Sequence, residues 1–297
     1  MTFIELFDRT DRLGTNIISY IAQLLYAHYN GYYIQYIREN LHYNDSMFVA
    51  CIFDLIDEHN RYLISKGYSP YINDTRVDIV QRREDLMLLS STVVLAIGTD
   101  LFTYFKAHFG ERAQEILAMH AQYRHYTKRK QFDPDITTVV HLRLEDVENV
   151  PDYDGRISSN YFRSKIDRCI PCGVEYYRPY NCQAPLVDCK INNAIRNISK
   201  DNSIVIIASP QSTIKTVLDK DIIKDGDKNY MKIQSADEDY DLYLMSTCKY
   251  FIASRSTYPI SALFFGKHSI VYVPMWGHIV STGLYTKYDK TPYKYFF

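Results

Sequence analysis

The chain has 297 residues, enough for two domains of ordinary size, and its 46% hydrophobic and 23% charged residues are typical of a globular protein. Its 34 basic and 35 acidic side chains nearly cancel, and a basic run such as Lys128-Arg-Lys130 is too short for a nucleic-acid interface. With so small a net charge, the protein has no overall field that would attract nucleic acid or an anionic membrane. We therefore expect no nucleic acid among the partners.

The N-terminal segment carries Glu5 and Asp8 where a secretory signal peptide needs basic residues. Nowhere does an uninterrupted apolar run reach the roughly 18 residues that a transmembrane helix requires. We therefore expect a cytoplasmic or otherwise soluble intracellular protein with no membrane span.

Apolar periodicity predicts a helix-rich domain over the first 130 residues. Ile17, Ile21 and Leu24 share one face of a helix over residues 15–30, which Asn30-Gly31 is expected to end. A strand is expected from Tyr32 to Ile37. The other helices of this domain are expected at residues 47–65, 80–96, 100–109 and 112–127.

A polar stretch with a proline, from Lys128 to Asp135, marks the domain boundary, which we place between residues 130 and 131. Beyond it, short apolar strands alternate with helices, which is the pattern of a doubly wound parallel sheet. The strands are expected at Thr138–Leu142, Ser203–Ala208, Tyr250–Ala253 and Ser269–Val273, and the helices near residues 190–199, 212–219, 239–247 and 259–265.

Three polar turns are candidate binding segments. The first runs from Asp11 to Asn16 and opens the first helix. Gly14 would let the backbone approach a ligand closely, and Asn16 offers both a hydrogen-bond donor and an acceptor. An ordinary helix N-cap explains this turn equally well.

The second candidate is the end of the strand around Val140. His141 and Arg143 are two residues apart, so on a strand they face the same side. An imidazole beside a guanidinium suits a bound diphosphate, with Arg143 as a bidentate phosphate clamp. The alternative is a structural ion pair of Arg143 with Glu145 or Asp146.

The third candidate follows the strand that is expected to end at Ala253. There Ser254-Arg-Ser-Thr257 leads into a helix, with Ser256 or Thr257 at the N-cap, Pro259 in the first turn and Gly266 at the end. Free backbone N–H groups and the helix dipole at such an N-terminus favour an anion. The turn from Ser254 through Arg255 and Ser256 to Thr257 is therefore a candidate phosphate site, and a helix capped without any ligand is the alternative.

Together these motifs resemble the fucosyltransferase superfamily, which covers α1,2-, α1,6- and protein O-fucosyltransferases. The resemblance rests on the Gly-x-Asn turn at Gly14 and Asn16, on the His-x-Arg-x-x-Asp strand end at His141, and on the segment from Asp239 to Ala262. That segment is similar to the family pattern D-L-x-L-M-S-x-C-x-x-x-I-x-S-x-S-T-F-S-x-x-A, and the three motifs span nearly the whole chain.

The resemblance implies a GT-B glycosyltransferase: two Rossmann-like domains facing a cleft, with the nucleotide sugar bound mainly by the C-terminal one. It implies inversion at the anomeric carbon, a glycan acceptor and no obligatory metal or other cofactor. In the family, the arginine matching Arg143 contacts the donor diphosphate, the histidine matching His141 positions the nucleotide sugar, and the turn matching Ser256 and Thr257 cradles the phosphates. The resemblance makes GDP-fucose the first choice of donor. Tyr258-Pro259 replaces Phe-Ser, and because of this departure UDP-xylose stays open as the second choice.

Two other classes of protein remain open at this stage. A metal-dependent GT-A transferase would use an Asp-x-Asp triplet, whereas a non-catalytic sugar-binding module would have no need of Arg143. Such triplets more often form loops and helix starts than metal sites, and they occur at Asp133-Pro-Asp135, Asp152-Tyr-Asp154, Asp225-Gly-Asp227 and Asp237-Glu-Asp239.

Four cysteines lie close together in the sequence. A Cys-x-x-Cys pair with two more cysteines could hold zinc, although the second pair is widely spaced, and free thiols or a disulfide are the alternatives. The four residues are Cys169, Cys172, Cys182 and Cys189.

An acceptor hydroxyl must lose its proton, so the reaction needs a base. We expect the base in the N-terminal domain if the donor occupies the other one. Asp8 and Asp11 precede the Gly14 turn, and Asp11, which is nearer to the glycine, is the predicted base. An ion pair with Arg9 or Arg12, or a helix cap, is the structural alternative for Asp11.

Overall fold

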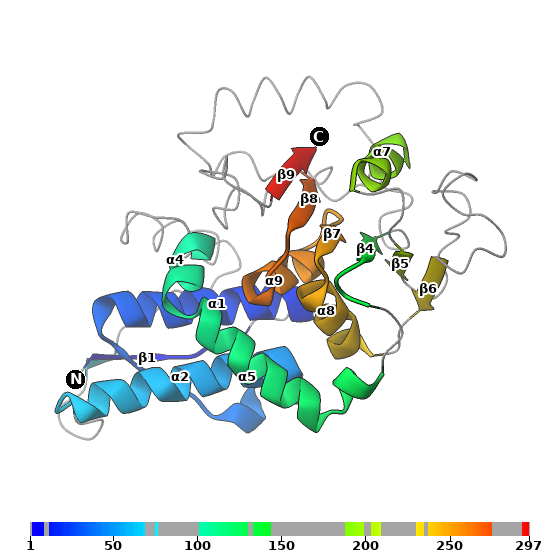
Figure 1. Ribbon diagram of the computed structural model, residues 1–297. Coiled ribbons are helices and arrows are strands. Elements are labelled where there is room, and N and C mark those ends of the chain that lie inside the picture. Colours follow the sequence, from blue (N-terminus) through cyan, green and yellow to red (C-terminus); the bar gives the residue numbers. More distant parts are fainter. Residues whose placement is uncertain are drawn as a thin grey trace, which may run out of the picture. The chain divides into compact units, whose positions relative to one another are not determined.

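The computed structural model describes residues 2–8, 12–68, 75–76, 101–129, 133–143, 188–198, 203–208, 230–234, 237–274 and 293–296. The chain forms two compact units, one built mainly from Met1–Thr127 and the other mainly from Lys128 onward. Each unit combines helices with a parallel sheet, which confirms the α/β class (Figure 1). The helices expected at 80–96 and 212–219 lie outside the described residues.

The N-terminal unit has a small parallel sheet with β1 in its centre. The strands are β1 (Thr2–Glu5), β2 (Tyr33–Gln35) and β3 (Thr75–Arg76), in the order β2-β1-β3. The other elements are α1 (Leu13–Asn30), the 3-10 helix η1 (Arg38–Asn40), α2 (Met47–Ser65), α4 (Leu101–His108), α5 (Gly110–Tyr123) and the 3-10 helix η2 (Tyr126–Lys128). The sequence did not predict β1 or β3. The strand expected from Tyr32 to Ile37 contains β2, and the helices expected at 15–30, 47–65, 100–109 and 112–127 correspond to α1, α2, α4 and α5.

Helix α1 ends where the sequence predicted but begins earlier. Gly31 adopts a left-handed conformation, with φ of 67°, and its N–H bonds to the carbonyl of Ala27, which confirms the expected stop. The helix begins at Leu13 and not at residue 15. Gly14 therefore belongs to the first helical turn, which corrects the expectation of a glycine turn ahead of the helix.

Two buried side-chain amides act as strand partners in this unit. The amide of Asn60 on α2 accepts from the main-chain N–H of Ile34 at 2.9 Å and donates to its carbonyl at 2.8 Å. The amide of Gln23 on α1 forms the same pair of bonds with Phe7, both at 3.0 Å. These bonds satisfy backbone groups that would otherwise be buried without partners. They connect β2 to α2 and the segment after β1 to α1.

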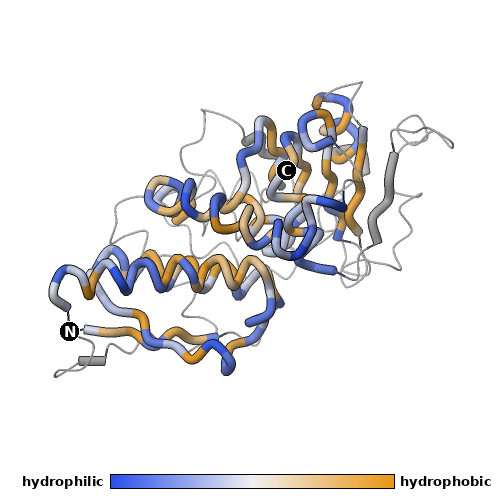
Figure 2. Tube along the Cα trace, turned by 60° about the horizontal axis from the view of Figure 1, so that its bottom comes forward, coloured by the Kyte–Doolittle hydropathy of each residue, from blue (hydrophilic) through white to orange (hydrophobic). Residues whose placement is uncertain are grey.

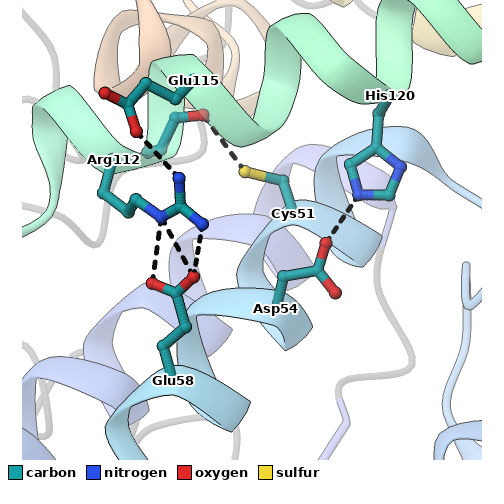
Figure 3. Close-up of polar contacts among 7 residues, drawn as sticks. Cys51, Asp54, Glu58, Arg112, Glu115 and His120 are labelled. Atoms are coloured by element: carbon teal, nitrogen blue, oxygen red, sulfur yellow. Dashed lines mark hydrogen bonds and ion pairs between the residues drawn. The ribbon is translucent and has the colours of Figure 1, made fainter.

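Helices α2 and α5 pack side by side and share polar contacts along one edge (Figure 3). Arg112 donates to the carboxylate of Glu58 from Nε at 3.0 Å and to that of Glu115 at 2.8 Å. His120 contacts Asp54 at 2.8 Å. Pairs this exposed stabilise by about 1 kcal/mol or less, so the apolar side chains buried between the helices dominate their association.

The C-terminal unit is built on a parallel sheet. Its strands are β4 (Thr137–Leu142), β5 (Ser203–Ala208), β6 (Tyr230–Gln234), β7 (Tyr250–Ile252), β8 (Ile270–Pro274) and β9 (Tyr293–Phe296). All described pairs are parallel, and the order is β6-β5-β4-β7-β8-β9. Counted from β4 as the first strand, this order is 3-2-1-4-5-6, that of Rossmann-type sheets. The sequence missed β6 and β9.

Helices cover both faces of this sheet. They are α7 (Asp188–Ile198), α8 (Glu238–Thr247) and α9 (Thr257–Phe265). Helix α7 packs on the face that carries Val140 and Leu142, whereas α9 lies on the opposite face, against His141, and packs against α8 (Figure 1). Strands β4, β5, β7 and β8 are largely hydrophobic along their length, as expected for a sheet covered on both sides (Figure 2).

No helix among the described residues combines the length and apolar character needed to cross a membrane.

Candidate functional site

The strand order of the C-terminal sheet reverses between β4 and β7. From β4 the chain builds outward to β5 and β6, then returns to β7 on the other side of β4 and continues to β8 and β9. Sheets of this kind bind ligands where the order reverses, outside the carboxyl ends of the two central strands. Because β4 and β7 pair with Val140 opposite Ile252, the residues that follow each strand lie side by side.

His141 is fixed at this point by the residues that follow β7. Its Nδ1 atom lies 2.7 Å from Oγ of Ser254, and its ring is 5.7 Å from that of Tyr258. Burial, and after it the positive charge of Arg143, lower the pKa of His141 to about 3. The imidazole is therefore neutral at physiological pH and can orient a ligand without adding a charge.

Arg143 contacts the next residue of the same turn. Its guanidinium donates to the main-chain carbonyl of Arg255 at 3.3 Å. His141 and Arg143 therefore contact consecutive residues, Ser254 and Arg255, as expected for two side chains on the same side of a strand end. Glu145 and Asp146, the alternative partners of Arg143, lie outside the described residues.

The turn after β7 leads directly into α9. Ser256 is the N-cap, and its hydroxyl accepts from the N–H of Tyr258 at 3.3 Å. Helix α9 begins at Thr257, two residues before the expected 259, so Ser256 is the N-cap of the two candidates that the sequence offered. The side chains of Ser254, Arg255 and Ser256 are buried, with Arg255 only 2% exposed. An N-terminus of this kind presents backbone N–H groups and the positive end of the helix dipole to a ligand.

Tyr258 is a member of the cluster that the sequence did not single out. It is partly buried, its ring lies against that of His141, and its hydroxyl donates to the main-chain carbonyl of Glu238 at the start of α8. Burial raises the pKa of Tyr258, and so do the nearby acidic groups in the first turn of α8. The only signal in the sequence was the departure from phenylalanine at this position of the family pattern, which gives no indication of a contact with His141.

The N-terminal candidates belong to the other unit. Gly14 and Asn16 are buried in the first turn of α1, where the main-chain N–H of Asn16 donates to the carbonyl of Arg12 at 3.2 Å and its side-chain amide at 3.4 Å. Asp11, the predicted base, lies outside the described residues. The cluster at the carboxyl ends of β4 and β7 thus consists of His141, Arg143, the Ser254–Thr257 turn and Tyr258.

Two of the four Asp-x-Asp triplets have structural roles. Asp133 accepts from the main-chain N–H of Asp135 at 2.9 Å and forms a turn before β4. Asp237 caps α8 by accepting from the N–H of Tyr240 at 3.0 Å, and it also pairs with Arg129 at 2.8 Å. The triplets at 152–154 and 225–227 lie outside the described residues.

Zinc binding by the four clustered cysteines stays a prediction. Cys169, Cys172 and Cys182 lie outside the described residues, and Cys189 stands in the first turn of α7. Among the described residues no three His, Cys, Asp or Glu side chains gather in a way that could hold a metal ion.

No protein-family model matches the chain, and no curated protein matches it either. The fold defines a class, an α/β protein with a doubly wound parallel sheet, and its candidate site is the cluster at the carboxyl ends of β4 and β7.

Proposed function

We propose that the chain is an inverting glycosyltransferase of GT-B type, in which the C-terminal unit binds a nucleotide-diphosphate sugar and the N-terminal unit serves a glycan acceptor. GDP-fucose is our first choice for the sugar donor, and UDP-xylose is the alternative. The observation that carries the proposal is the joint contact of His141 and Arg143 with the turn that begins α9.

This arrangement suits a diphosphate for electrostatic reasons. The guanidinium of Arg143 and the N–H groups of the α9 N-terminus are donors on neighbouring elements, and an anion between them would be held from both sides. His141, being neutral, adds a directed hydrogen-bonding group but no charge. A non-catalytic sugar-binding module would not need this concentration of anion-binding groups.

In the proposed reaction the acceptor oxygen attacks the anomeric carbon of the donor. The new carbon–oxygen bond forms as the bond to the diphosphate breaks, and the nucleoside diphosphate leaves with the bonding electron pair. Arg143 and the α9 N-terminus stabilise the negative charge that develops on the leaving group. The hydroxyl proton passes to a base, and His141 is unsuited to that task because its pKa is about 3.

The test is a panel of nucleotide sugars added to the purified protein, with the melting temperature as readout. A nucleotide sugar that binds only the folded protein must raise it. We expect GDP-fucose to give the largest rise and UDP-xylose the next, and we expect Arg143→Ala to remove the rise. Lys249 lies at the amino end of β7, away from the strand ends that carry the site, so Lys249→Ala is the matched control and should keep it. No rise with any member of the panel would overturn the proposal.

A further inference from the structure

The N-terminal unit contains an aspartate–histidine pair at the carboxyl ends of two neighbouring strands. β1 and β2 run parallel, with Glu5 opposite Gln35, and the pairing continues to Leu6, whose N–H donates to the carbonyl of Gln35 at 2.8 Å. Asp8 stands three residues after β1, and His42 stands seven residues after β2, beyond the 3-10 helix η1. The two residues are 34 positions apart in the sequence, yet Nδ1 of His42 lies 2.7 Å from Oδ2 of Asp8.

Contacts with helix α1 hold Asp8 in place independently of His42. The Tyr20 hydroxyl of α1 donates to Oδ1 of Asp8, and the amide of Gln23, one turn further along the helix, fixes the main chain of the preceding residue, Phe7. The side chain of Asp8 is only 15% exposed. Burial, and after it the bond to Asp8, raise the pKa of Tyr20, so the phenol remains a donor to this carboxylate.

His42 is bound to the same carboxylate twice. Its main-chain N–H and its ring Nδ1 both contact Oδ2 of Asp8. A carboxylate oxygen accepts hydrogen bonds, so Nδ1 of His42 is the donor in this pair, and in the neutral ring Nε2 is the acceptor. The ring is 61% exposed, which leaves it accessible to a ligand.

We infer that His42 is the base that takes the proton of the attacking hydroxyl, and that Asp8 is a positioning residue that fixes its tautomer and stabilises the imidazolium. This inference rests on the proposed glycosyl transfer. The proton leaves the hydroxyl for Nε2 of His42 as the oxygen bonds to the anomeric carbon, and the departing diphosphate takes the electron pair. Aspartate-oriented histidines perform this task in other enzymes.

An ordinary surface ion pair is the competing explanation, and the same unit offers one for comparison. His120 lies 2.8 Å from Asp54, but both residues stand on helices, α5 and α2, and the aspartate is 44% exposed. The Asp8–His42 pair differs in that Asp8 lies just beyond the carboxyl end of β1 in a parallel sheet, where α/β sheets bind ligands. It differs also in that the buried phenol of Tyr20 donates to its carboxylate.

The experiment measures the release of GDP from GDP-fucose, or of UDP from UDP-xylose, with water as acceptor, in the parent and in three variants. His42→Gln keeps a polar group near Asp8 but cannot take a proton, and it should lower kcat by roughly a hundredfold or more, with the donor-induced rise in melting temperature unchanged. Imidazole in solution should partly restore the rate of His42→Ala, a result that a structural role would not give. His120→Gln should retain the parental rate.

The outcomes separate the two proposals. A parent that neither binds nor turns over any nucleotide sugar overturns the proposed function, and the assignment of His42 with it. A parent that turns over a donor, beside a His42→Gln variant of equal kcat, overturns the assignment of His42 alone. In that case Asp11→Asn tests the base predicted from the sequence.

Discussion

Nδ1 of His141 and Oγ of Ser254 lie 2.7 Å apart, although 113 residues separate them in the chain. The contact joins the end of β4 to the turn after β7, the two places where the strand order reverses. Because both side chains are buried, removing either partner leaves a polar atom without a hydrogen bond inside the protein.

Arg143→Ala should abolish turnover and leave the fold intact. Removal of a charged clamp from a leaving group costs about 3 kcal/mol of transition-state stabilisation, or roughly a hundredfold in rate. Steady-state kinetics on the variant, with circular dichroism as the check of folding, gives the comparison. A folded Arg143→Ala protein with near-parental kcat/KM would exclude contact between Arg143 and the diphosphate.

The stability of the protein should fall in acid because His141 is buried in its neutral form. Its pKa is about 3 when folded and returns to the ordinary 6.5 when the chain unfolds. The unfolded chain therefore binds the extra proton, and the stability that is present above pH 6.5 is lost as the pH falls toward 3. At pH 5 the loss from His141 amounts to about 2 kcal/mol.

Urea unfolding of the parent and of His141→Asn at pH 7 and pH 5 measures this loss. The asparagine can still bond to Ser254 but does not titrate, so its stability should change less between the two pH values. His28 also has a pKa lowered by burial, to about 4, and it contributes to the pH dependence of both proteins. Identical pH dependence in parent and variant would mean that His141 is not buried neutral.

Turnover should survive EDTA. If Arg143 and the α9 N-terminus together stabilise the negative charge of the diphosphate, no divalent cation is needed to bridge its phosphate groups. The measurement is the rate of nucleoside diphosphate release before and after treatment with EDTA. Loss of the rate in EDTA and its recovery with manganese would favour the GT-A alternative, with the triplets at 152–154 and 225–227 as the first places to search.

Asn60→Ala should destabilise the N-terminal unit strongly. The N–H and the carbonyl of Ile34 would both lose their partner while remaining buried, at a cost of about 3 kcal/mol. The exposed Asn30, which donates only to the carbonyl of Tyr26 on its own helix, is the matched control, and Asn30→Ala should change the free energy of unfolding by well under half as much. Equal effects of the two substitutions in urea unfolding would contradict the role of Asn60.

The sequence predicted the strands and the turn of the C-terminal candidate site because these residues lie next to strong local signals. Four apolar strands, and an N-cap at Ser256 or Thr257, could be placed from spacing alone, and parallel pairing then brings His141 to Ser254. The Asp8–His42 pair had no such signal. The strand β1 is short, and the acidic residues Glu5 and Asp8 interrupt its apolar pattern, so it was not predicted. Without β1, nothing in the sequence connects Asp8 with a histidine 34 residues away.

The Asn60 amide also limits the pairing of β2 with strands of other copies of this protein. β2 is the outer strand of the described sheet, and the backbone groups of an outer strand can pair with a strand from another molecule. Asn60 hydrogen-bonds both the N–H and the carbonyl of Ile34, and His59 contacts the carbonyl of Tyr32 at 2.8 Å. Two neighbouring residues of α2 therefore cover this side of the strand. The same helix that stabilises β2 thereby closes it to intermolecular strand addition, the first step toward aggregation.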